Sequence, residues 1–215
     1  MWALVESNNV TQVYKRPKQL TIGDVNYPSN IFNLWTSSEL EAIGLYEIVV
    51  DNSNLKDPNY YFNNNQTFAF ADGVVTASYG TATARALADT LYTAQDVTDD
   101  VYPEGHASAG DRVNKWSEGD VKTPGLKTSH KAIINQQAYE LLLSNDWMVV
   151  KATETGGSVA SDWTTYRSAV RTADASMKTK INAVSDVDAL AALYVYNNAT
   201  PPVRPLGEFP DVPSS

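Results

Sequence analysis

Acid–base chemistry near neutral pH usually needs a histidine, and the 215-residue chain has only two, His106 and His130. His106 lies near Glu104 and Asp111 in a polar, acidic stretch. The sequence contains no nucleophile elbow, no phosphate-binding loop, no dinucleotide-binding glycine pattern and no His-x-x-x-His pair. We therefore predict a protein that is not an enzyme and has no cofactor, with His106 as an exposed loop residue.

A second candidate for chemistry is the loop formed by residues 51–57, where oxygen-bearing side chains alternate as in a calcium-binding loop. Lys56 occupies the sixth position, where such loops carry glycine, and Phe62 occupies the twelfth, where they carry glutamate. Clusters of Asn and Asp more often form turns. We expect turns here and no metal site. A glycan hydrolase would need a carboxylate pair on a cleft wall, whereas many acids of this chain cluster in one polar segment.

Composition excludes several kinds of partner. The formal net charge is -9 and the isoelectric point is about 4.6, so the surface repels the phosphates of nucleic acids and anionic membranes. The chain has no cysteine and therefore no disulfide or thiolate metal site. We find neither a signal peptide nor a window approaching the roughly 18 apolar residues of a membrane span. We expect the protein to be made in a cytoplasm.

Residues 1–80 are predicted to form a small, mostly antiparallel β unit. Turn-forming residues at 7–9 and 63–65 each separate two β-prone segments, which predicts two hairpins. Asp72 and Gly73 form a further hairpin signal.

One short helix is expected inside this β unit. Thr36 and Ser38 each precede a glutamate at capping-box spacing, and Gly44 is a suitable stop signal. Residues 45–50 then resume a strand pattern.

The remaining chain changes character twice, which predicts an α+β protein. Residues 81–125 are predicted to contain the start of a helix, followed by a long acidic arm with several glycines and prolines. Residues 126–200 have helical periodicity and are expected to form a helical hairpin or a three-helix region, the third helix starting at Ser185. Residues 201–215 are proline-rich and read as an extended tail.

Tryptophan is a common anchor in protein interfaces, and the chain has five. Trp35, Trp147 and Trp163 lie on apolar faces or beside helix ends, which favours a role in the core. Trp116 lies in the polar arm and Trp2 at the chain end. We single out Trp2 and Trp116 as candidates for binding a partner.

Residues 138–147 and 161–171 resemble the phage tail assembly chaperone family. The shared pattern is a helix ending in a Leu-Leu pair, then Asp-Trp, a spacer, and Trp-x-x-Tyr-Arg at the start of a second helix. The matching positions are Leu142, Leu143, Asp146, Trp147, Trp163, Tyr166 and Arg167. The N-terminal part is also similar, more weakly, to tail-fibre assembly proteins and tail proteins of tailed phages. In this motif Trp147 is expected to fold over a hairpin of two helices that Trp163 and Tyr166 close, with Arg167 bonded to an acid or to carbonyls at the hinge.

The resemblance implies a non-enzymatic protein of the tail, baseplate or tail fibre of a bacteriophage, made in the host cytoplasm and located in the virion. Its partners would be other tail or fibre proteins and copies of itself. The acidic arm and the proline-rich end are additions to the family pattern and favour a subunit retained in the particle. A transient tail-fibre assembly chaperone is the alternative, and a head decoration protein is a further one.

Overall fold

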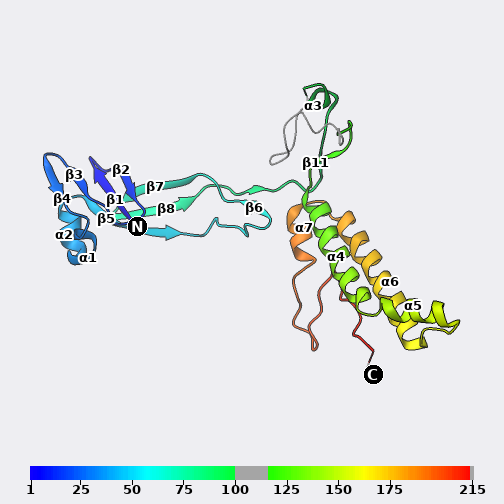
Figure 1. The fold of residues 1–215 in the computed structure, drawn as a ribbon. Coiled ribbons are helices and arrows are strands. Elements are labelled where there is room, and N and C mark those ends of the chain that lie inside the picture. Colours follow the sequence, from blue (N-terminus) through cyan, green and yellow to red (C-terminus); the bar gives the residue numbers. More distant parts are fainter. Residues whose placement is uncertain (100–115, 214–215) are drawn as a thin grey trace. The chain divides into compact units, whose positions relative to one another are not determined.

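The computed structural model describes residues 1–99 and 116–213 and divides into two compact units, Met1–Ala84 and Arg85–Ser215. The large sheet belongs to the first unit and the long helices to the second, so the predicted α+β class is confirmed (Figure 1). The central part of the expected acidic arm, which includes His106, lies outside the described residues.

A five-stranded sheet organises the first unit. Its strands are β1 (Trp2–Glu6), β2 (Asn9–Tyr14), β5 (Leu45–Asp51), β7 (Gln66–Ala71) and β8 (Val74–Tyr79). They lie in the order β2-β1-β5-β8-β7, and all neighbours run antiparallel except β5 and β8, which run parallel. Ser7 and Asn8 connect β1 to β2, and Asp72 and Gly73 connect β7 to β8, all four with positive φ. Both of these predicted hairpins are confirmed.

The hairpin predicted around residues 63–65 is wrong. Strand β6 (Tyr61–Phe62) pairs with β9 (Thr83–Ala84), while β7 pairs with β8. The Asn63 side chain closes the preceding loop instead, since it accepts from the Lys56 N–H at 2.9 Å and donates to the Lys56 carbonyl at 2.7 Å. A second small pair is formed by β3 (Leu20–Ile22) and β4 (Val25–Tyr27).

Two short helices cover one face of the sheet, where we predicted one. They are α1 (Ile31–Leu34) and α2 (Ser37–Ala42). The predicted capping box is present at Thr36, whose hydroxyl accepts from the Glu39 N–H at 3.3 Å while the Glu39 carboxylate accepts from the Thr36 N–H at 2.8 Å. Gly44 follows with φ of +82°, and a Cβ there would lie 2.9 Å from the Val5 carbonyl oxygen.

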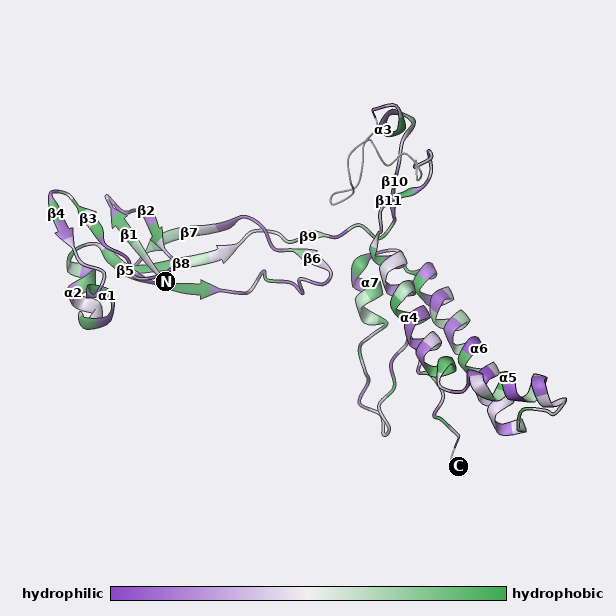
Figure 2. Cartoon of the chain, in the orientation of Figure 1, coloured by the Kyte–Doolittle hydropathy of each residue, from purple (hydrophilic) through white to green (hydrophobic). Residues whose placement is uncertain are grey.

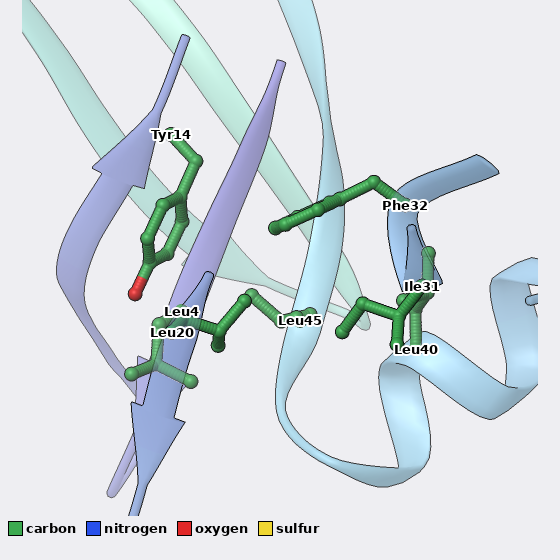
Figure 3. Close-up of a cluster of buried hydrophobic side chains, with 7 residues drawn as sticks. All are labelled: Leu4, Tyr14, Leu20, Ile31, Phe32, Leu40 and Leu45. Atoms are coloured by element: carbon green, nitrogen blue, oxygen red, sulfur yellow. The ribbon is translucent and has the colours of Figure 1, made fainter. Parts of the chain in front are cut away.

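The sheet of the first unit is covered by apolar side chains on both faces. Seven buried residues pack between the sheet and the two helices: Leu4, Tyr14, Leu20, Ile31, Phe32, Leu40 and Leu45 (Figure 3). Alternate positions along the strands form a second cluster on the other face: Ala3, Ile48, Val75 and Ala77. Side chains of both edge strands pack onto this second cluster, so the sheet curls around it.

Helices dominate the second unit, with a small strand pair before them. The elements are β10 (Thr90–Leu91), α3 (Ala94–Thr98), β11 (Val121–Thr123), α4 (Leu126–Leu143), α5 (Asp146–Thr155), α6 (Ser161–Ala183) and α7 (Val187–Ala192). Helices α4 and α6 pack side by side. Both carry a mixture of hydrophobic and hydrophilic residues, as helices with one packed face do (Figure 2).

Two details of the helical region differ from the prediction. A fourth helix, α5, begins at Asp146, where we expected a connecting segment, and it ends at Gly156, whose φ of +66° terminates a helix without strain. The cap of α7 is Asp186 and not Ser185, because the Asp186 carboxylate accepts from the Ala189 N–H at 2.7 Å.

The described ends of the expected arm are folded. Strands β10 and β11 pair, and Lys122 on β11 lies 2.5 Å from Asp96 on α3. This hydrogen bond, together with those from Thr93, holds the pKa of Asp96 at about 2.

The proline-rich segment after residue 200 contains no helix or strand in its described part, yet it folds back onto the helices. Leu206 is buried, and its N–H donates to the Leu193 carbonyl at 2.9 Å. The Lys180 ammonium donates to the carbonyls of Pro205 and Leu206 at 2.8 and 3.0 Å. Phe209 packs against the apolar cluster that residues of α4 and α6 form. This part of the tail is therefore used inside its own chain.

The start of α4 is held by the segment that precedes β10. The Asp89 carboxylate accepts from the Gly125 N–H at 2.7 Å and from the Thr128 hydroxyl at 2.8 Å. The next two amides of α4 donate to the carbonyls of residues 86–87. Backbone carbonyls therefore satisfy the first amides of α4, while Asp89 fixes the glycine at its start and the side chain of Thr128.

We predict that Gly125→Ala destabilises the second unit by about 1–3 kcal/mol, the range typical of overpacking. A Cβ at this position would lie 2.3 Å from the Ala88 carbonyl oxygen. Gly157→Ala is the control, because its nearest contact would be the Thr155 hydroxyl at 3.4 Å. Urea denaturation measures both changes, and equal stability of the two variants would contradict the close approach at Gly125.

Candidate functional site

Three of the motif positions named above, Leu142, Asp146 and Arg167, meet at the Arg167 guanidinium, which projects from α6 toward the junction of α4 and α5. Nη1 donates to the Leu142 carbonyl at 3.1 Å and to the Asn145 side-chain oxygen. Nη2 donates to the Asp146 carboxylate at 2.6 Å. One side chain thus ties the last turn of α4, the turn residue and the first residue of α5 to α6, as the motif predicted for Arg167.

Two polar side chains at this junction are buried and therefore need hydrogen-bond partners within the protein. The Arg167 side chain is only 11% exposed, and Asn145 is 1% exposed. A guanidinium removed from water costs free energy unless its donors are bonded and its charge is paired. The Asn145 amide also donates to the Leu141 carbonyl at 2.8 Å, so both ends of this side chain are used. Asp146, about half exposed, adds a charge-assisted hydrogen bond at the positive end of the α5 dipole.

An apolar cluster lies beside the arginine and joins α4 to α6. Tyr166 and Val170 of α6 are buried against Ala138 of α4. Trp163 packs on the edge of this cluster, and its ring meets that of Tyr166 at 5.8 Å in an edge-to-face arrangement. Two further members, Leu142 and Phe209, are partly buried there. The expected closing role of Trp163 and Tyr166 matches this packing.

Two motif residues lie elsewhere. Trp147 is 57% exposed and does not fold over the helix hairpin, so that prediction is wrong. It stands on α5, a helix that points it outward, with the Lys151 ammonium 5.9 Å from its ring. Leu143, the second leucine of the pair, is also exposed. We did not predict α5 from the sequence. Because Trp147 stands on this helix and not in a turn, its side chain faces a different direction from the one expected.

Helix α5 exposes several large apolar side chains on the surface. It has no buried residue, although it carries Trp147, Val149 and Val150, all exposed. Trp147, Val150 and Lys151 follow helical spacing and share one side of the helix. Exposed Leu143 and Tyr139 lie just before it on α4. Large exposed apolar groups gathered at one place are typical of a protein contact surface.

The two tryptophans predicted to bind a partner both make contacts within the chain. Trp2 is half-buried and packs on Phe32 with ring centroids 4.8 Å apart. Trp116 is also half-buried and stacks on Tyr92 at 5.5 Å and 8°. Both rings are therefore packed against another aromatic ring of the same chain, Trp2 in a tilted and Trp116 in a stacked arrangement.

His130 and the Asn- and Asp-rich loop at residues 51–57, both considered above for chemistry, serve packing and turn formation. His130 bonds through Nδ1 to the Tyr194 hydroxyl at 2.7 Å, and burial lowers the pKa of this histidine. In the loop once considered for calcium, Asp51 accepts from the Ser53 N–H at 2.9 Å, so the expected turn chemistry is confirmed. Within residues 1–99 and 116–213, no three acidic or histidine side chains are placed to hold a metal ion.

Asn145 and Phe209 are the contributors that the sequence did not reveal. Asn145 stands after a leucine-rich helix and looked like a turn residue, whereas its buried amide connects α4 to Arg167. Phe209 lies in the proline-rich segment, where its packing on the α4–α6 cluster had no local signal.

We predict that Arg167→Lys lowers the free energy of unfolding by about 3–5 kcal/mol, the cost of breaking a buried charged network. A lysine has one ammonium group and cannot reach the three acceptors in the geometry that guanidinium provides. Arg171→Lys, one turn along α6 and exposed, should cost less than about 0.5 kcal/mol. Chemical denaturation of both variants is the measurement, and similar small losses would show that the Arg167 network does not stabilise the junction.

Comparison with known proteins gives no relative for this arrangement: no family model, no curated protein and no solved structure matches the chain. Among the described residues, no helix has both the length and the apolar character needed to cross a membrane. The candidate site therefore consists of a buried arginine junction and of helix α5, which starts at this junction and exposes apolar side chains.

Proposed function

We propose that this chain is a non-enzymatic structural protein of a tailed-phage virion that acts through protein–protein contacts in the tail, baseplate or tail fibre. The observation that carries the proposal is α5, which exposes Trp147 and Val150 and buries none of its residues. A partner surface that covers these side chains would remove apolar area from water, which is the main driving force of association.

The contact role accounts better than catalysis for the chemistry of the described residues. The strongest charged network, around Arg167, connects structural elements through carbonyl, amide and carboxylate acceptors. Capping and turn formation account for the carboxylates of Asp89, Asp96 and Asp186. These groups are engaged in holding the fold.

The motif around Arg167 supports the tail assignment, because its positions resemble the tail assembly chaperone pattern and five of the seven lie at or beside the arginine junction: Leu142, Asp146, Trp163, Tyr166 and Arg167. We place the protein in the virion, after synthesis in the host cytoplasm, with other tail or fibre proteins and copies of itself as partners. A transient chaperone would use the same exposed helix to cover a fibre protein and then leave. A head decoration protein is the less favoured alternative.

Quantitative mass spectrometry of gradient-purified phage particles tests this proposal. We expect the chain at a fixed copy number in intact virions and in isolated tails. A capsid protein and a host cytoplasmic protein serve as positive and negative controls. Its absence from particles, together with aggregated fibres in a deletion phage, would overturn the structural role in favour of the chaperone, and its presence on heads alone would overturn the tail location.

A further inference from the structure

The loop between β2 and β3 concentrates positive charge in an acidic protein. Lys15, Arg16 and Lys18 lie within four residues and all are exposed. None of these three side chains forms an ion pair or a hydrogen bond with a residue that the structure describes. The Lys18 ammonium lies 5.2 Å from the centre of the Tyr14 ring. Three cations are therefore available to an anion from outside the chain.

Lys18 also lines a pocket between β2 and β3. The pocket has a volume near 390 Å³, within the range of about 300–1,000 Å³ that is typical of small-molecule sites. Its lining residues are Gln12, Tyr14, Lys18, Gln19, Leu20 and Thr21. The pocket thus combines one cation with amide, hydroxyl and apolar groups.

The walls of this pocket are fixed by the fold. Tyr14 at the end of β2 and Leu20 at the start of β3 both belong to the buried cluster of Figure 3. The Tyr14 hydroxyl donates to the side-chain oxygen of Gln12 at 2.7 Å, and the Thr21 hydroxyl donates to that of Asn26 at 2.6 Å. A ligand would therefore meet groups that are already in position, which lowers the entropy cost of binding.

Two amide side chains of the pocket keep hydrogen-bonding capacity. The bond from Tyr14 uses the oxygen of Gln12 and leaves its amide nitrogen to donate. The Gln19 side chain is exposed and has no hydrogen bond to another described residue. An amide both donates and accepts, so it matches a hydroxyl group, which does the same.

We infer that this pocket binds a small carboxylated sugar, of the uronic acid type. The carboxylate pairs with the Lys18 ammonium, and ring hydroxyls bond to the amides of Gln12 and Gln19. An acidic peptide would supply the carboxylate without the hydroxyls that the two glutamines match. The inference concerns the first unit and does not depend on the contact role proposed for α5.

The net charge of -9 does not oppose this binding. Salt limits the reach of an exposed charge to about 8–10 Å, so the charges beside the pocket decide. Burial and, to a smaller extent, the charge of Glu6 raise the pKa of Tyr14, which places one carboxylate near the pocket. Glu6 does not line the pocket, and three cations outnumber it. Binding should weaken as ionic strength rises.

Calorimetric titration of the full-length protein at low salt tests the inference. The probes are glucuronic acid, galacturonic acid and N-acetylneuraminic acid. Glucose lacks the carboxylate and acetate lacks the ring hydroxyls, so these two serve as control ligands. We expect at least one acidic sugar to bind on the order of tenfold more tightly than either control.

Three variants identify the pocket as the binding site. Lys18→Gln should weaken binding of that sugar on the order of tenfold, because the cation is lost. Gln19→Ala should weaken binding of the sugar and leave that of acetate unchanged. Lys151→Gln is the control, since it removes the same charge from an exposed lysine on α5. Circular dichroism checks that the variants are folded.

Four results would overturn the inference. They are no binding by any acidic sugar of the panel, binding of acetate as tight as that of the sugar, and equal affinities in Lys18→Gln and Lys151→Gln. The fourth is tighter binding of a triglutamate peptide, which would make the pocket a contact site for an acidic protein segment. The presence of the chain in virions is measured separately, so failure here leaves the structural role standing.

Discussion

The buried Arg167 guanidinium is the interaction on which the second unit depends. It binds the end of α4, the Asn145 amide and the first residue of α5 at once, and its charge is balanced by Asp146. Because a buried cation tolerates few alternative arrangements, it fixes where α5 begins and in which direction it leaves the helix pair. The exposed side of α5, with Trp147 and Val150, follows from that direction.

The rest of the second unit supports this junction through contacts distant in sequence. Asp89 holds the first turn of α4, and Lys180 holds the segment that contains Leu206. That segment brings Phe209 onto the cluster beside Arg167. A short stretch of chain near the C-terminus thus completes the core next to the arginine.

Local patterns predicted those parts of the fold that short-range chemistry determines. The Asp72-Gly73 turn and the Thr36 capping box involve residues within three positions of each other, and both are present. Pairing between distant segments leaves no short-range pattern in the sequence: β6 pairs with β9, and Asn63 closes the loop before it. At the candidate site, the role of Arg167 was predicted from the motif. The exposure of Trp147 depends on α5, whose weak apolar pattern did not separate a helix from a connection.

Hydrogen exchange of the α5 amides tests the central claim that Arg167 holds this helix in place. In Arg167→Lys, we expect residues 146–155 to lose protection while the middle of α4 and α6 keeps it, because the apolar cluster remains. Arg171→Lys should leave protection in all three helices unchanged. Equal protection of α5 in the wild-type protein and in Arg167→Lys would show that α5 is held without the arginine junction.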